Sequence, residues 1–415
     1  MKIPGGFHAL RECLQIRDFR LYVIGNVAHG LGIWLLRMTI GWLAWELEKS
    51  TAWLGAVAMA ETAPSLILAL FAGTVVDRFN FVRLMQITQG LSAALAACFA
   101  ILTLSDSIGI WLLFGLTVLR GCLMAFNRPS RMVLLHHLVG RDLLAPALAI
   151  GSITHNGTRF IGPALGGVII AGAGIGWGFV AASALIGVYA LILLLLPVDI
   201  EAPKREHRSM LADTIDGLAY ITSHPGIRMQ LALLVVMGIV ARPVIDLLPG
   251  YAGQVFEKGA DGLAMLLAAH GIGATIAGVW IAARASGLEG MTRLSLLSVP
   301  FVASMLMLFV ATDIFWVGVA GSALLGFGLL ILTVTSQTLI QSAVDPAFRG
   351  RVVSVHGLVM MGIPALGAIA LGGLAEFFGL RLPVLAGAAI FIAFWTLAWH
   401  RRGMLRQSLE KSPAP

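Results

Sequence analysis

The sequence predicts an all-α membrane protein with twelve transmembrane helices, arranged as two pseudo-symmetric six-helix bundles. The 415-residue chain is 58% hydrophobic and only 12% charged, whereas soluble domains average about 25% charged residues. Its mean hydropathy is +0.91. The apolar sequence divides into about twelve stretches of ~20 residues, the length that crosses a ~30 Å hydrocarbon core. Motifs of the first half also recur in the second half, which predicts that the two bundles are related by internal repetition.

The expected spans start near residues 21, 52, 84, 109, 143, 174, 227, 262, 294, 314, 352 and 381. Spans one to six form an N-terminal bundle, residues 1–196, and spans seven to twelve form a C-terminal bundle with a short tail, residues 227–415. Residues 197–226 between them carry the densest charge in the chain. This linker contains one amphipathic stretch, which we expect to form an interfacial helix. The 48 glycines suit helices that pack closely in a bilayer.

The distribution of basic residues predicts the orientation. Roughly 21 of the 28 Lys and Arg residues fall on the side of the two termini and the linker. About three fall on the other side, namely Lys49, Lys258 and Arg381. Because cytoplasmic loops are enriched in basic residues, we expect a multi-pass protein of the cytoplasmic (inner) membrane with both termini in the cytoplasm.

Composition and motifs argue against several other classes of protein. The formal charge of +7 lies in no basic block with interleaved aromatics, so nucleic acid is not an expected partner. Cys13, Cys98 and Cys122 form no CxxC pair, and we expect neither a metal site nor a cofactor. The N-terminus lacks the apolar core of a cleaved signal peptide. Without a P-loop or nucleophile motif, an enzyme is not expected.

The loop after the second span reads "GTVVDRFNFVR", and it predicts a conformational latch formed by Gly73, Asp77 and Arg78. Gly73 permits close helix approach, and Asp77 can accept bonds from a helix N-terminus or from an arginine. The alternative is a solvated loop that only obeys the positive-inside rule. A copy after span eight, "GVWIAAR", has Ala282 where the second Asp would stand.

A second motif pairs the fifth and eleventh spans. "HNGTRFIGPALGG", residues 155–167, resembles "VHGLVMMGIPALGA", residues 355–368. Pro163 and Pro364 each remove an intrahelical hydrogen bond, and Gly162 beside Pro163 allows tight packing. We expect both helices to bend at these residues.

Charged residues inside a bilayer usually face a cavity and have a function. Glu61 is expected near the midplane of the second span, and burial combined with a nearby arginine can bring a carboxylate into the titration range of a proton carrier. Asp246 is the next candidate for proton coupling. The alternative for Glu61 is a permanent structural ion pair.

Several cations are expected to bind substrate or balance charge inside the membrane. The repeat places Val359 opposite Arg159, so packing alone does not require an arginine at that position. Arg159 is therefore expected to pair with Glu61 or with an anionic group of a substrate. The remaining candidates for substrate or charge pairing are Arg37, Arg242 and His270, and we expect Pro243 to interrupt the helix that carries Arg242 and Asp246.

The motifs after the second span, "LRGCLMAFNRPSR" at residues 119–131, and "QTLIQSAVDPAFRGRVVSVHGLVMMGIPALG" at residues 337–367 resemble those of the major facilitator superfamily. The resemblance covers almost the whole chain. It is strongest to the multidrug and siderophore exporters of the proton antiporter branch. It implies the major facilitator fold and associates Arg120 with proton coupling, although the glycine of that motif directly follows Arg120 here.

Together these observations predict a monomeric, proton-coupled exporter of amphiphilic small molecules, such as a drug, a siderophore or a secondary metabolite. Its other partners would be protons and membrane lipids. One alternative is a proton-coupled uptake symporter of the same fold, and a less favoured one is a membrane sensor or scaffold that transports nothing.

Overall fold

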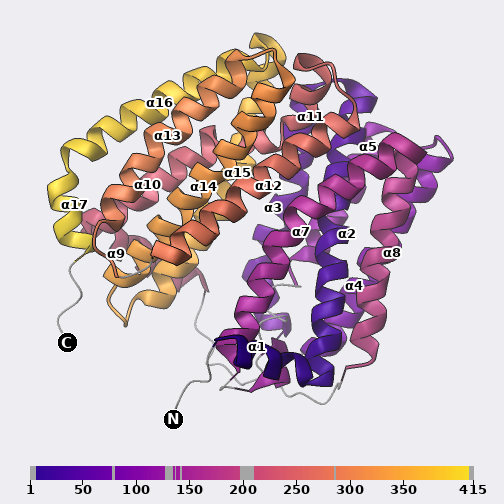
Figure 1. The fold of residues 1–415 in the computed structure, drawn as a ribbon, viewed down its shortest axis with the longest axis horizontal. Helices are drawn as coiled ribbons and strands as arrows, with labels where there is room; N and C mark the ends of the chain where they lie inside the picture. The colour runs from indigo at the N-terminus through magenta and orange to yellow at the C-terminus, as the bar shows by residue number, and fades with distance from the viewer. Residues whose placement is uncertain are drawn as a thin grey trace. The chain divides into compact units, whose positions relative to one another are not determined.

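The computed structural model describes residues 6–76, 80–126, 134–135, 137–140, 143–196, 210–284 and 287–410. Within these ranges all regular secondary structure is helical. Twelve helices correspond to the twelve expected spans: α2 (Arg17–Glu48), α3 (Thr51–Val76), α4 (Phe81–Leu104), α5 (Ile110–Met124), α7 (Leu144–Ala173), α8 (Ile175–Leu194), α10 (Pro225–Val240), α12 (Ala260–Arg284), α13 (Met291–Ala311), α14 (Phe315–Ala343), α15 (Arg349–Phe378) and α16 (Arg381–His400). Ten of the described helices are long and apolar enough to cross a membrane. The predicted fold class is confirmed (Figure 1).

Contacts divide the chain into two units, and helix α3 takes part in both. The first unit comprises Met1–Leu47 and Ala63–Glu206, and the second comprises Glu48–Thr62 and His207–Pro415. The second unit thus includes Glu48–Thr62, a segment that the predicted halves assign to the N-terminal bundle. The division within α3 lies beside Pro64. Proline has no backbone N–H, so α3 lacks one helical hydrogen bond close to the point where its contacts pass from the second unit to the first.

Small residues set the packing of the first unit. A Cβ at Gly32 of α2 would lie 2.9 Å from the Ile186 side chain of α8, so only glycine permits this close approach. Helices α4 and α8 are joined by stacked rings of Phe99 and Phe179, 5.2 Å apart. Near the chain's start, α1 (Gly6–Gln15) contributes Cys13, whose thiol donates to the Leu143 carbonyl at 3.6 Å. Burial raises the pKa of this thiol, so Cys13 is a packing residue rather than a reactive one.

The second unit has a close helix crossing and a buried polar cluster. Gly326 of α14 lies against the His270 carbonyl of α12, where a side chain would clash with backbone. Gln230 of α10 accepts hydrogen bonds from Ser295 of α13 at 3.0 Å and from Ser336 of α14 at 2.9 Å. All three polar side chains are fully buried. The cluster therefore fixes three helices in register through hydrogen bonds that replace those lost to water.

The expected interruption at Pro243 is confirmed. Helix α10 ends at Val240, and a 3₁₀ turn, η1 (Arg242–Ile245), follows. The chain then continues through the short α11 (Leu248–Gly250) and a π-helical turn, η2 (Tyr251–Val255).

Two shorter helices belong to the second unit. Helix α9 (Met210–Ser223) is the helix expected in the linker, and its Asp216 forms an ion pair with Arg351 of α15 at 3.3 Å. Next to that pair, the rings of Tyr220 and Phe348 stack 4.6 Å apart. Helix α17 (Arg402–Leu409) follows α16 and buries Leu405 and Leu409 against the end of the bundle. Its position beside α10 is visible in Figure 1.

Candidate functional site

Glycines of the fifth-span motif bring α7 against α2. A Cβ at Gly162 would lie 2.7 Å from Cβ of Trp34 and 3.1 Å from the Leu31 carbonyl, so the backbone of α7 rests directly on α2 at this point. One turn further, Gly166 lies against the sulfur of Met38, where a Cβ would be 3.0 Å away. The contact leaves Trp34 held from one side by the α7 backbone.

Three polar side chains surround the Trp34 ring. The guanidinium carbon of Arg159 lies 5.5 Å from the ring centroid and that of Arg37 lies 5.8 Å away. The imidazole of His155 is 6.2 Å from the indole, centroid to centroid. Helix periodicity explains the convergence, since Trp34 and Arg37 are three residues apart on α2, and His155 and Arg159 are four apart on α7. We call Trp34, Arg37, His155 and Arg159 the Trp34 cluster.

The Trp34 cluster combines positive charge with an aromatic face. Each cation–π contact is worth roughly 0.5–1 kcal/mol in an exposed setting and about 2 kcal/mol or more when water is excluded. Trp34, Arg37 and Arg159 are each only partly buried. Arginines at membrane depth that keep accessible surface almost always face a cavity or the bundle interior. The cluster is therefore suited to hold a molecule that has both an anionic group and an apolar or aromatic body.

Glu61 lies on α3, three residues before Pro64, and its side chain is partly buried. It belongs to the second contact unit, whereas Arg159 belongs to the first. The predicted pairing of these two residues remains a prediction. What the structure adds is that Glu61 lies three residues before Pro64, which removes one backbone hydrogen bond from a helix that continues to Val76.

The other expected charged residues have different surroundings. Arg120 is buried in α5 and is 4% exposed. Arg242 opens the 3₁₀ turn and Asp246 directly follows it, both partly buried. His270 is also 4% exposed and sits at the α12–α14 crossing, so packing surrounds it. None of these residues belongs to the Trp34 cluster, and their proposed roles stay predictions.

Of the predicted latch, Gly73 lies near the end of α3, while Asp77 and Arg78 fall outside the described residues. The neighbouring Asn80 has a structural role at the start of α4. Its Oδ1 accepts hydrogen bonds from the backbone N–H groups of Val82 and Arg83 at 3.0 and 3.2 Å. Asn80 is thus the N-cap of α4, a position that favours asparagine.

The proline-containing helices α7 and α15 are continuous through Pro163 and Pro364. In α15, a Cβ at Gly367 would lie 2.7 Å from the carbonyl oxygens of Gly238 and Ile239 in α10. The α10–α15 contact thus repeats the close packing of the α2–α7 contact. The bending expected at these residues remains a prediction.

Sequence reasoning missed a carboxylate that joins α3 to α15. Oε2 of Glu376 accepts hydrogen bonds from the Ser50 hydroxyl at 2.9 Å, the Thr51 hydroxyl at 3.1 Å and the Ala52 amide at 3.2 Å. The Thr51 hydroxyl is also 2.9 Å from the Gly372 carbonyl. Glu376 thereby caps the start of α3 with a residue distant in sequence. The only available sequence signal was a carboxylate at the end of an apolar span.

Trp34 and His155 were also missed as site residues. Their spacing from Arg37 and Arg159 placed each beside an arginine on its own helix, but sequence alone could not show that the two helices meet through Gly162. Tryptophan is common in membrane spans as a packing or interface residue. The residue type alone therefore did not distinguish Trp34 as part of a site.

Comparison with known proteins agrees with this architecture. The family model described as "transmembrane secretion effector", within the major facilitator superfamily, matches residues 11–412. The chain is 27% identical to the staphyloferrin A transporter of Staphylococcus aureus, over 84% of this chain and 87% of that one. It is 26% identical to the multidrug efflux pump Tap of Mycolicibacterium fortuitum, over 88% and 91%.

Among solved structures, a POT family transporter in complex with 5-aminolevulinic acid is similar in fold, with a TM-score of 0.74. The alignment covers 93% of this chain and 96% of that one, and the 10% identity means that this likeness shows the fold alone. The family match covers nearly all of the sequence and separates the protein from enzymes. The chain is therefore a multi-pass membrane transporter of the major facilitator superfamily and belongs to its transmembrane secretion effector family.

Proposed function

We propose that this transporter is a proton-coupled exporter of amphiphilic small molecules that carry an anionic group. The observation that carries the proposal is the Trp34 cluster, with two guanidinium groups within 6 Å of one indole ring. An anionic head would be bound by Arg37 and Arg159, which are always charged and can form bidentate hydrogen bonds to carboxylate or phenolate oxygens. An apolar or aromatic body would pack on Trp34.

The names of the relatives support this class of cargo. One relative is named for a siderophore and another for multidrug efflux. Both descriptions fit small organic molecules that combine polar and apolar parts. We therefore propose a siderophore, a drug or a secondary metabolite as the cargo.

Glu61 is the proposed proton carrier. A carboxylate that alternates between a dry and a wet environment changes its pKa, because burial disfavours the charged form. Its place near Pro64 supports such a change, since the backbone hydrogen bond that Pro64 removes makes α3 easier to bend close to Glu61. Arg120 and Asp246 are the remaining candidates for proton coupling.

Transport would proceed by alternating access between two conformations. We propose that Gly73, Asp77 and Arg78 stabilise one of them, and that Pro163 and Pro364 allow α7 and α15 to bend between them. The bonds of Glu376 to α3 supply a second stabilising contact of this kind. A contact that exists in only one conformation shifts the population toward it.

We further propose that both termini and the 197–226 linker lie in the cytoplasm, that the protein is in the cytoplasmic membrane, and that it acts as a monomer. The lopsided distribution of basic residues supports this orientation. Cysteines introduced at Lys204 and Pro415 should resist an impermeant thiol reagent in whole cells. Ready labelling at both positions would reverse the orientation.

The test of the transport mechanism is flux in proteoliposomes driven by a pH gradient. Glu61→Gln mimics the protonated carboxyl, so this variant should bind cargo but lose gradient-driven flux. Glu48→Gln, at the exposed end of α2, is the matched control and should behave as the wild type. Normal coupled flux in Glu61→Gln would exclude Glu61 as the carrier and make Asp246 the next candidate. Flux of cargo in the same direction as protons would identify the protein as an uptake symporter.

A further inference from the structure

A cavity of about 710 Å³ lies at the α17 end of the second unit, outside the Trp34 cluster. Its wall is formed by the loop before α13, the first turns of α13, the end of α16 and helix α17. The residues that line it are Glu289, Gly290, Thr292, Arg293, Leu296, Trp399, Arg402, Gly403, Arg406 and Glu410.

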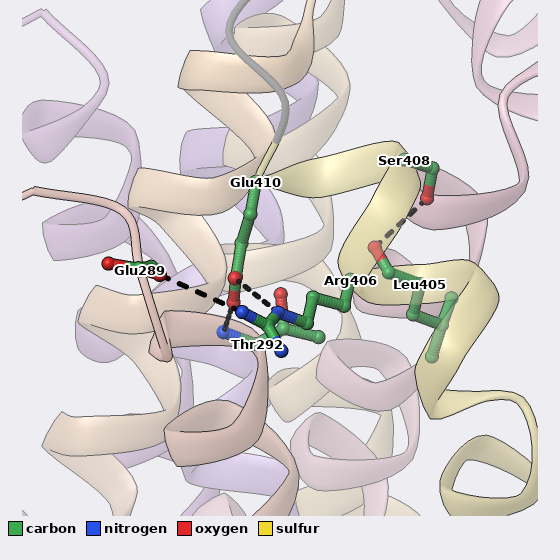
Figure 2. A network of polar contacts seen from close by, with 6 residues as sticks. All are labelled: Glu289, Thr292, Leu405, Arg406, Ser408 and Glu410. Carbon is green, nitrogen blue, oxygen red and sulfur yellow. Dashed lines mark hydrogen bonds and ion pairs between the residues drawn. The ribbon is translucent and has the colours of Figure 1, made fainter.

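One arginine of the cavity, Arg406, pairs with both of its carboxylates, and this network keeps one net negative charge. Nε of Arg406 is 3.2 Å from Oε2 of Glu410, and its Nη2 is 3.8 Å from Oε1 of Glu289. Oε1 of Glu410 also accepts the Thr292 amide at 3.0 Å, which caps the start of α13. Figure 2 shows this network, with Arg406 between the two carboxylates. The network closes one side of the cavity and holds α17 against α13.

The other two arginines have no carboxylate partner among the described residues. Arg293 is exposed on the first turn of α13. Arg402 lies over the ring of Trp399, 4.9 Å from its centroid, and donates to the Trp399 carbonyl at 3.3 Å. The lining therefore carries three guanidinium groups against two carboxylates, and Arg293 and Arg402 supply the excess positive charge that suits an anion with several acceptor oxygens.

A buried hydroxyl supplies a second and independent indication of a ligand. Thr292 lines the cavity and is 2% exposed, and its Oγ1 has no hydrogen-bond partner in the part of the chain that the structure describes. A buried polar atom without a partner costs roughly 1–3 kcal/mol unless a ligand or water satisfies it. An oxygen of a bound anion would accept this hydroxyl's hydrogen.

The depth of the cavity in the membrane indicates which anion is available. Trp395 and Trp399 lie at the end of α16 with ring centroids 5.5 Å apart, and His400, Arg401 and Arg402 follow them. Tryptophans next to basic residues at the end of a span mark the headgroup region of a bilayer. Basic pockets between helices at this level suit lipid headgroups. Met404 of α17 and Leu397 of α16 are 44% and 46% exposed, so the two helices that line the cavity also carry apolar surface that acyl chains could cover.

We propose that this cavity binds the phosphate group of an anionic phospholipid. Arg293 and Arg402 would bind the phosphate oxygens, the Thr292 hydroxyl would donate to one of them, and the acyl chains would lie along α16. The bound lipid would join α13, α16 and α17, since residues of all three line the cavity. This site is separate from the cargo site and does not depend on the direction or coupling of transport.

The test is native mass spectrometry of the purified full-length protein in detergent, titrated with phosphatidylglycerol. The wild type should retain one lipid tightly. Arg293→Gln combined with Arg402→Gln should weaken that binding roughly tenfold or more, the size expected for the loss of charge-assisted hydrogen bonds. Arg401→Gln is the matched control, because Arg401 is an exposed neighbour that does not line the cavity. Equal lipid binding by the double variant and the wild type would overturn the proposal.

Two further arms test the hydroxyl and the source of the phosphate. Thr292→Val, which has nearly the same shape, should weaken lipid binding severalfold, while Thr292→Ser should preserve it. Zwitterionic phosphatidylcholine and millimolar inorganic phosphate are the competing probes, and neither should displace phosphatidylglycerol from the wild type. Displacement by inorganic phosphate at comparable concentration would assign the cavity to a soluble anion and contradict a lipid site.

Discussion

The α2–α7 contact and the α10–α15 contact are built in the same way but carry different side chains. In both, the glycine three residues after the motif proline lies against the neighbouring helix, Gly166 on the Met38 sulfur and Gly367 on the carbonyls of Gly238 and Ile239, and in the first contact Gly162 also lies on Trp34. The first contact also gathers Arg37, His155 and Arg159 around an indole ring.

In the second contact the positions that correspond to Arg159 are apolar, Val359 by the repeat and Met360 by distance from the proline. The shared glycines and prolines therefore explain packing, and the unshared cations indicate where the two halves differ in function. A residue that departs from the internal repeat is a better indicator of a site than a residue that follows it.

The largest expected effect comes from removing the unshared charge. Arg159→Ala should lower transport of an anionic cargo by about 30-fold or more, because truncating one partner of a desolvated charge contact costs about 2–5 kcal/mol. Val359→Ala, at the corresponding position of the second half, should change transport less than about twofold. The measurement is initial flux in proteoliposomes, normalised to the amount of folded protein. Equal loss of flux in the two variants would mean that the charge of Arg159 does not distinguish the first half from the second in transport.

Substitution of the packing glycines of the two contacts, Gly162 and Gly367, should affect the stability of the protein about equally. Gly162→Ala and Gly367→Ala each place a Cβ 2.7 Å from a neighbouring atom, so both should destabilise the protein by about 1–3 kcal/mol. Thermal unfolding in detergent checks this. Only Gly162→Ala should also weaken cargo binding, since it displaces Trp34. Equal loss of cargo binding in both variants would show that the glycine contact, rather than the cluster, determines affinity.

A smaller effect is expected at the cap of α3. Glu376→Gln keeps an acceptor oxygen but loses the charge, and should cost about 1 kcal/mol of stability. Glu376→Ala should cost more, because the Ser50 and Thr51 hydroxyls and the Ala52 amide lose their shared acceptor. Ser50→Ala should cost less than Glu376→Ala, since two donors to Glu376 remain, although it also removes the Oγ that accepts the Trp53 amide at 3.3 Å. Thermal unfolding of the three variants should show Glu376→Ala as the least stable, and a larger loss for Ser50→Ala than for Glu376→Ala would contradict the cap.

The smallest effect concerns pH at the junction of α9 and α10. Burial lowers the pKa of His224, and its neutral Nδ1 accepts the Ile227 amide at 3.2 Å. Because the folded pKa lies below the unfolded value of about 6.5, this stabilisation is present above that value and is lost as pH falls below it.

The wild type should therefore lose up to about 1 kcal/mol between pH 7.5 and pH 5 relative to His224→Asn, which caps the helix without titrating. Identical pH dependence of the two proteins in thermal unfolding would exclude His224 as the source.

The sequence predicted the fold well, because span length, glycine content and the repeat are properties of single segments. It also singled out Arg37 and Arg159, whose roles in transport stay predictions. It could not show that these arginines meet on Trp34, since that contact depends on which helices cross and at which glycine.

The cap by Glu376 and the cavity beside Arg406 join segments far apart in the chain, over 300 residues for Glu376 and Ser50 and over 100 for Glu410 and Thr292. A pattern of neighbouring residues in the sequence cannot predict hydrogen bonds between residues so far apart in the chain. Asn80 shows the reverse case, since its capping of α4 joins residues only two and three positions apart.

The central claim is that the Trp34 cluster recognises the negative charge of the cargo. It is tested most directly by comparing the binding of one amphiphilic carboxylate with that of its neutral methyl ester. The wild type should bind the carboxylate at least roughly tenfold more tightly, the difference expected for a charge-assisted contact. Arg37→Gln combined with Arg159→Gln should bind both molecules with similar affinity. An unchanged preference for the carboxylate in the double variant would contradict the account.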